Sequence, residues 1–235
     1  MTRRVSVVPI PEHEVNMHMT PKVLVLAVVL LALPVQAQRR TDPPPPGTKY
    51  SLLGGETVGT GVNVASGEFG WPGISFGITH GLNRDTDIGA RFDLLFGFEE
   101  TTISQFGVGF RVPLRMTAMR SDRISVLLHV DPGLKIYSTS PALFGLQFPI
   151  GAVLGYAYSR DLTVAFGVDL PMTLFVTPSP VQLILAPTFG PAVEFHVDPR
   201  LTVGLNTRFG PVVTTRSGGG SEFGLVMQVL GAYRI

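Results

Sequence analysis

The stretch at residues 201–210, LTVGLNTRFG, decides the fold because it alternates between two kinds of side chain. Leucine, valine, leucine and phenylalanine stand at positions 201, 203, 205 and 209. Threonine, glycine, asparagine and arginine stand at positions 202, 204, 206 and 208. A period of two is typical of a β-strand whose two faces meet different surroundings. The apolar face is the more regular one, which favours a strand that turns apolar side chains to lipid and polar side chains to an interior.

The same alternation recurs from residue 58 to residue 235 and predicts an all-β protein. We expect a transmembrane antiparallel up-and-down β-barrel of about ten strands, with about eight as the alternative because the first hairpin is rich in glycine. The expected strands are residues 57–64, 74–81, 87–96, 103–116, 123–137, 144–158, 162–176, 181–198, 201–210 and 223–235.

The breaks between these strands are of two kinds. Short polar clusters stand at residues 83–85, 120–122, 159–161 and 198–200, and longer breaks stand at 66–73, 97–102, 138–143, 177–180 and 211–222. Short turns that alternate with longer loops are typical of outer-membrane barrels, in which the short turns are periplasmic. We interpret Pro132, Pro149, Pro171 and Pro211 as marks of the outer rim, because proline disrupts strand pairing. Pro113 has no place in this scheme.

The composition is apolar without a membrane-spanning apolar run. Of the 235 residues 45% are hydrophobic and 15% are charged, against roughly 25% charged in soluble domains. The longest apolar run, residues 23–33, is shorter than the about 20 residues that a spanning helix needs. The absence of cysteine excludes disulfides and a lipid-bearing cysteine. The formal net charge of +1 gives no indication of a nucleic-acid partner.

The N-terminal region carries targeting features. Lys22 precedes the apolar run, and Val35-Gln36-Ala37 fits the rule for a cleavage site with small residues. We therefore predict a signal peptide at residues 1–37, with the start at Met17 or Met19 as a possibility. A proline-rich periplasmic linker follows at 38–50 and the barrel at 51–235. These features predict export and an outer-membrane location.

The C-terminal segment alternates in the same way and ends with Tyr233 third from the end. It resembles the C-terminal β-signal of bacterial outer-membrane proteins, although Ile235 stands where phenylalanine is usual. Residues 77–89 are also similar to the inner turns of small barrels in this group. The resemblance implies outer-membrane lipid and the barrel-assembly machinery as partners. Its implied assembly signal is Leu225, Met227, Val229, Tyr233 and Ile235.

Charged side chains inside the expected strands take the parity opposite to the apolar set. A cation on the lipid face at mid-bilayer costs about 2–4 kcal/mol, so we place these charges in the lumen. We expect Asp93 to pair with Arg111, and Arg111 with Asp131. The expected lumen network is Arg91, Asp93, Arg111, Arg115, His129, Asp131, Lys135, Asp169, Glu194, His196 and Arg208.

Three functions remain open at this stage. Balanced charges favour a largely plugged barrel with a structural or surface-interaction role, and the alternative is a narrow channel for small solutes. A third possibility is a hydrolase at the rim that uses His129 and Asp131, because His-Val-Asp-Pro occurs at 129–132 and again at 196–199 with both side chains expected inside. We expect no enzyme activity, because no nucleophile motif accompanies these residues, and no cofactor or metal site.

Overall fold

The computed structural model describes residues 50–99, 101–177, 181–215 and 220–235. About 71% of these residues lie in β-strands, all pairings are antiparallel, and the described part contains no helix. The all-β antiparallel class is therefore confirmed. Among the same residues, no helix is long and apolar enough to cross a membrane. The predicted signal peptide and residues 38–49 of the predicted linker lie outside the described part.

The described chain forms fifteen strands. They are β1 (Asn63–Trp71), β2 (Gly73–Gly81), β3 (Thr86–Gly97), β4 (Ser104–Arg111), β5 (Leu114–Arg120), β6 (Ile124–Val130), β7 (Gly133–Tyr137), β8 (Leu143–Gln147), β9 (Ile150–Ala157), β10 (Leu162–Leu170), β11 (Met172–Thr177), β12 (Gln182–Leu185), β13 (Thr188–His196), β14 (Leu201–Thr214) and β15 (Ser221–Arg234).

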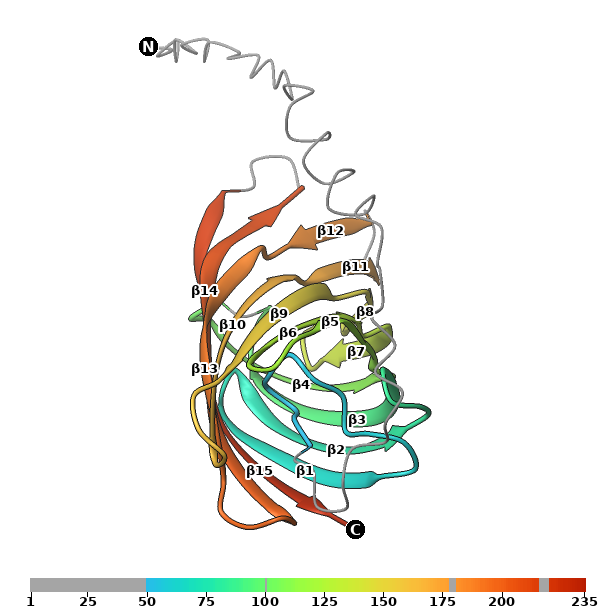
Figure 1. Cartoon of the computed structure of the whole chain (residues 1–235). Helices are drawn as coiled ribbons and strands as arrows, with labels where there is room; N and C mark the ends of the chain where they lie inside the picture. The colour runs from blue at the N-terminus through green and yellow to red at the C-terminus, as the bar shows by residue number, and fades with distance from the viewer. Residues whose placement is uncertain (1–49, 100, 178–180, 216–219) are drawn as a thin grey trace, which may run out of the picture. The chain divides into compact units, whose positions relative to one another are not determined.

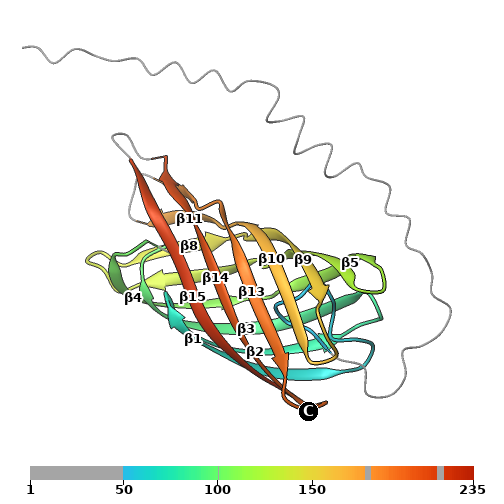
Figure 2. The same cartoon turned by 60° about the vertical axis from the view of Figure 1, so that its left-hand side comes forward.

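The strands form one sheet that closes on itself (Figure 1). The sheet runs in the order β12-β11-β8-β7-β4-β3-β2-β1-β15-β14-β13-β10-β9-β6-β5, and the additional pairings β3–β5 and β12–β14 close it. One closed circuit through these pairings passes through 12 strands. Long β14 and β15 lie side by side and extend beyond β1 (Figure 2). Because the sheet closes, its strands surround an interior.

Proline explains why the strand count differs from the expected ten. Pro113, Pro132, Pro149, Pro171 and Pro187 each separate two consecutive strands of the chain. The register is unchanged across such a break: Leu170 pairs with Ile150 before it and Thr173 with Gln147 after it. A proline has no N–H to donate, so the ladder is interrupted while the chain continues in the same direction.

These prolines do not mark a rim, so that interpretation was wrong. Pro171 lies between β10 and β11, and the strand path continues to Thr177. Pairing is preserved on the acceptor side, because the carbonyls of Pro149 and Pro171 accept the N–H groups of Asp131 and Ala186 at 2.8 and 2.9 Å. The prolines interrupt the middle of the wall.

The first strand also differs from the prediction. We expected a strand at 57–64 and a loop at 66–73, but β1 spans Asn63–Trp71 and only Pro72 separates it from β2. Glycines at 67 and 70 weaken the apolar pattern there, whereas polar Ser66 and Glu68 on one parity and aromatic Phe69 and Trp71 on the other are the signal that could have revealed the strand. Residues 50–62 precede β1 and pass through the interior of the ring (Figure 1).

The two ends of the ring differ in their connections. The four predicted short turns join β2 to β3, β5 to β6, β9 to β10 and β13 to β14, and hydrogen bonds such as Thr117 N–H to Asp85 O and His196 N–H to Asp161 O link them at one end. We call this the turn end. The opposite end, the loop end, carries Pro72, the loop at 98–103 and the other longer connections.

The outer face of the ring is apolar, and the inner face carries most of the buried polar and charged side chains together with three small apolar clusters. Large exposed side chains include Phe69 at 65%, Val168 at 56% and Leu154 at 50%, whereas Asp93 and Thr202 on the other parity are 2% and 0% exposed. The residues of the expected assembly signal lie on the outer face of β15, where Met227, Val229, Tyr233 and Ile235 are exposed. This distribution is the inverse of that in a water-soluble sheet protein.

Candidate functional site: the interior of the ring

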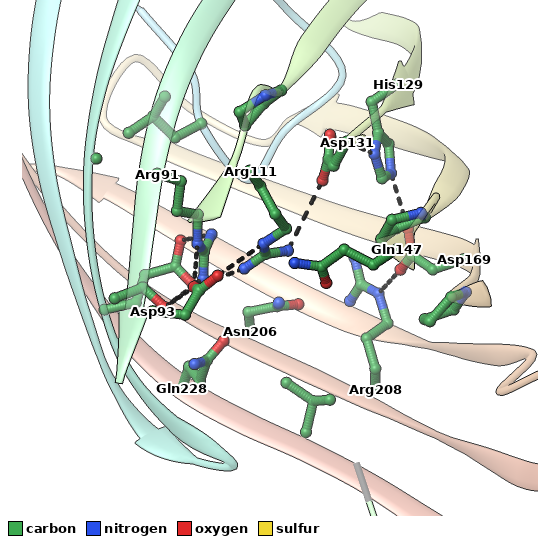
Figure 3. A pocket seen from close by; sticks show the side chains of 18 of the residues that line it. Arg91, Asp93, Arg111, His129, Asp131, Gln147, Asp169, Asn206, Arg208 and Gln228 are labelled. Carbon is green, nitrogen blue, oxygen red and sulfur yellow. Dashed lines mark hydrogen bonds and ion pairs between the residues drawn. The ribbon is translucent and has the colours of Figure 1, made fainter. Parts of the chain in front are cut away.

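Asp93 on β3 is the centre of a chain of ion pairs that crosses the interior at mid-height (Figure 3). Its two carboxylate oxygens accept hydrogen bonds from Ser75 Oγ at 2.7 Å, Arg91 Nε at 3.1 Å, and Arg111 Nη2 and Nε at 2.7 and 2.9 Å. Arg91 in turn donates two parallel hydrogen bonds to Glu68 at 2.6 and 2.7 Å. Such bidentate geometry is the strongest that a guanidinium makes with a carboxylate.

The chain continues on the other side of Arg111. Arg111 Nη1 lies 4.0 Å from Asp131 Oδ2, and Asp131 Oδ1 lies 3.4 Å from His129 Nδ1. The other ring nitrogen of His129, Nε2, lies 2.8 Å from Asp169 Oδ1. Arg208 Nε then donates to Asp169 Oδ2 at 2.8 Å (Figure 3).

Arg208 ends the chain against the backbone. Its Nη1 donates to the carbonyls of Gly190 and Thr207, each at 2.9 Å. Gly167 on β10 makes room for this guanidinium, because a Cβ at that position would lie 2.6 Å from Arg208 Cζ. Glycine is therefore required here by close approach to a charged group.

We call these eight residues the charge belt: Glu68, Arg91, Asp93, Arg111, Asp131, His129, Asp169 and Arg208. Acidic and basic groups alternate along it, so each charge has an opposite neighbour. The two pairs predicted from the sequence, Asp93 with Arg111 and Arg111 with Asp131, are both present. Glu68 was missed because its strand was interpreted as a loop.

Four of the predicted network residues lie outside the belt. Three of them, Arg115, Glu194 and His196, lie at the turn end. Glu194 accepts hydrogen bonds from Ser51 Oγ at 2.6 Å and from Leu52 N–H at 2.8 Å. Arg115 Nη2 donates to the carbonyls of Ser51 and Glu56 at 2.9 and 2.7 Å. These contacts attach residues 50–62, which we call the inner segment, to the wall.

The inner segment is also anchored at its first residue and near its end. Tyr50 is 1% exposed, and its hydroxyl lies 2.8 Å from the carbonyls of both Arg200 and Ala232. Val58 N–H donates to Asp87 Oδ2 at 2.9 Å. We expected the wall to begin at residue 51, but residues 51–58 lie inside the ring instead, because their backbone groups bond to inward-facing side chains, and Thr60 and Gly61 beyond them are exposed.

His196 belongs to the same end of the interior. Its Nδ1 lies 2.9 Å from Thr202 Oγ1, and its ring meets Tyr50 edge-on. The expectation that His196 and Asp198 share the inner face is wrong, because Asp198 is exposed and its Oδ1 accepts the backbone N–H groups of Arg200 and Leu201 at 2.6 and 2.7 Å. A carboxylate at this position closes the turn between β13 and β14.

Lys135, the fourth residue, lies towards the loop end. Its Nζ is 2.9 Å from Glu99 Oε1, which also accepts the hydroxyl of Tyr137 at 3.1 Å. The rings of Phe98, Tyr137 and Phe175 pack together with centroid distances of 5.0 to 6.1 Å. This aromatic cluster fills part of the interior, and the sequence did not reveal it because Phe98 and Glu99 stand in an expected loop.

A cavity of about 250 Å³ lies between these layers. Leu52 and Leu53 of the inner segment line one side, and Glu99 and Tyr137 line another. Charge-belt residues and four prolines, Pro72, Pro113, Pro149 and Pro171, complete much of its wall. The cavity volume is a little below the range for ligand pockets, which starts at about 300 Å³.

The chemistry of the described interior is that of ion pairing. No group of three or more metal-ligating side chains occurs in the described residues. His129 faces a carboxylate with each ring nitrogen and so bridges Asp131 and Asp169. No protein-family model matches the chain, and no curated protein is similar to it.

Proposed function

We propose that the chain is a bacterial outer-membrane β-barrel with a charge-paired, largely plugged lumen and a structural or surface-interaction role. The single observation that carries this proposal is the inverted distribution of side chains: the outer face of the closed ring is apolar and the interior is charged and paired. A closed sheet satisfies every backbone polar group internally, which hydrocarbon surroundings demand.

Three layers of side chains and backbone, and not the paired charges alone, support a plugged lumen. The inner segment occupies the turn end, the charge belt crosses the middle, and the aromatic cluster with Glu99 lies towards the loop end. In this proposal the turn end is periplasmic, and the outward-facing side chains of β15 serve the barrel-assembly machinery. Outer-membrane lipid contacts the apolar face.

Two measurements test this function. The purified protein should require detergent and should migrate faster on a gel before boiling than after, because a folded barrel resists the denaturing detergent. In a planar bilayer it should give no steady porin-like conductance. A chain that stays monomeric in buffer without detergent would contradict the membrane location, and a steady open state would contradict the plug.

The cavity favours a second candidate, a narrow channel for small solutes that opens when the inner segment moves. The chain has no cysteine, so one engineered disulfide can hold the segment in place. A Cβ at Gly54 would lie 3.1 Å from Thr163 Cγ2, so Gly54→Cys and Thr163→Cys would bring two thiols close together once Ser51 Oγ, 2.5 Å from the same Cβ, moves aside. If the reduced double variant conducts and the oxidised one does not, the channel is the function. If neither conducts, the plugged barrel stands.

A further inference from the structure

The cavity is lined by proline rings and by side-chain amides as well as by charged groups. Pro113, Pro149 and Pro171 line it from the strand paths β4–β5, β8–β9 and β10–β11. Asn206 and Gln228 line it from β14 and β15, where they are directly paired neighbours. In the circuit β3-β2-β1-β15-β14-β13-β10-β9-β6-β5, closed by β3–β5, β14 and β15 lie across the ring from β5 and β6. Pro113 therefore lies across the ring from this pair of side-chain amides, and Pro149 and Pro171 lie along the wall between them.

The charged groups of the cavity are already paired with one another. Arg91 and Arg111 donate to Glu68 and Asp93, and Arg208 donates to Asp169. Alternating signs leave no excess charge of either kind along the belt. An ionic ligand would have to break one of these pairs and leave its partner uncompensated, which is costly away from water.

The side-chain amides, in contrast, have hydrogen-bonding capacity left. Asn206 Oδ1 is buried and has no hydrogen-bond partner in the described structure. Gln228 Nε2 makes only a long contact of 3.5 Å with Gly73 O, and Gln147 Nε2 donates to Leu134 O at 3.1 Å. Each amide offers both donors and acceptors. Figure 3 shows Gln147, Asn206 and Gln228 directed into the cavity.

We propose that this cavity is a binding site for one small neutral ring polyol, such as a monosaccharide or a cyclitol. Such a molecule has hydroxyl groups at its edge, which match the amides, and C–H groups on its faces, which match the prolines and Tyr137. Its neutrality leaves the charge belt intact. The cavity volume of about 250 Å³ limits the ligand to a single ring. This site would exist whether or not the ring spans a membrane, so the proposed function and this proposal can fail separately.

Saturation-transfer NMR on the whole detergent-solubilised protein tests the proposal. The probes are glucose and myo-inositol, with gluconate as an anion of similar size and glycine as a smaller zwitterion. We expect the two neutral rings to bind and gluconate and glycine to bind at least tenfold more weakly. Preference for gluconate or glycine would overturn the proposal, as would a protein in which no probe binds and the cavity holds water only.

Two variants locate the binding. Asn206→Leu and Gln228→Leu should each weaken polyol binding by about three- to tenfold, because each removes one hydrogen bond between neutral groups. Gln105→Leu is the matched control, because Gln105 donates to Ser138 O and does not line the cavity. Since Asn206 Oδ1 is unpartnered, its replacement should not lower the thermal unfolding midpoint. Polyol binding that neither leucine variant weakens would place the ligand elsewhere and refute the site.

Discussion

Removal of the Asp93 carboxylate should destabilise the protein more than removal of its partner Arg111. Arg111 has two hydrogen bonds to Asp93, and its next acidic neighbour, Asp131, is 4.0 Å away. In Asp93→Asn, Arg111 would become a largely uncompensated cation whose side chain is only 19% exposed. Removing one member of a buried ion pair leaves the other charge uncompensated and lowers the free energy of unfolding by about 3–5 kcal/mol.

Arg111→Met removes only one of the partners of the Asp93 carboxylate. Asp93 keeps the guanidinium of Arg91 at 3.1 Å and the hydroxyl of Ser75 at 2.7 Å. We therefore expect a smaller loss of about 1–2 kcal/mol, the scale of charge-assisted hydrogen bonds. The double variant should lose no more stability than Asp93→Asn alone. It no longer contains Arg111, the cation that Asp93→Asn leaves without its partner. The coupling free energy between the two sites should exceed about 1 kcal/mol.

Equilibrium unfolding in urea with detergent or lipid present measures these differences. Trp71 is the only tryptophan of the chain, and its Nε1 donates to Thr101 O at 3.1 Å, so its fluorescence reports on the folded loop end. Asp161→Asn, in an exposed turn, is the control and should change stability by less than about 0.5 kcal/mol. Equal losses for Asp93→Asn and Arg111→Met, or strictly additive losses in the double variant, would refute the asymmetric coupling.

Three further predictions concern the wall and the turn end. Val168→Arg, on the outer face, should lower the free energy of unfolding by about 2–4 kcal/mol in a bilayer if that face contacts lipid. Equal stability of the variant and the unchanged protein in vesicles would contradict this. Gly81→Ala should cost about 1–3 kcal/mol, because its Cβ would collide with Gly59 O of the inner segment, whereas Gly231→Ala meets no neighbour and should be nearly neutral by the same urea titration. Two backbone N–H groups hold the pKa of Asp198 below its ordinary value. The stabilisation that Asp198→Ala removes should therefore be present at neutral pH and disappear as pH falls through that lowered pKa. If the unfolding midpoints of Asp198→Ala and of the unchanged protein differ by the same amount at every pH, this prediction is wrong.

Local sequence was sufficient for most of the strands and for the face on which most of their residues lie, although it misplaced the first strand and the side chain of Asp198. The alternation at residues 201–210 and in the C-terminal segment predicted β14 and β15, because side-chain direction in a strand follows a period of two. The same parity placed Asp93, Arg111 and Asp131 on one face. Their mutual contacts followed because neighbouring antiparallel strands bring residues at equal heights together. The four short turns were predicted from their polar triplets.

Residues 50–62, Glu68 and Glu99 show what the sequence alone did not determine. The inner segment has no periodicity, and its position depends on side chains far along the chain, such as Glu194 and Arg115, that bond to its backbone. Glu68 stands in a glycine-rich strand whose apolar pattern is weak, and Glu99 stands in a loop that folds back to Lys135.

The sequence by itself therefore determined the all-β class, the direction of most side chains in the strands and the charged groups of the interior, since these follow from residue type and a period of two. Only the tertiary structure decided how that interior is filled. Closure of the sheet joins distant strands, and this brings the inner segment, the belt and the aromatic cluster together around one cavity. Contacts between residues more than a hundred positions apart, such as Ser51 with Glu194, leave no local signal in the chain.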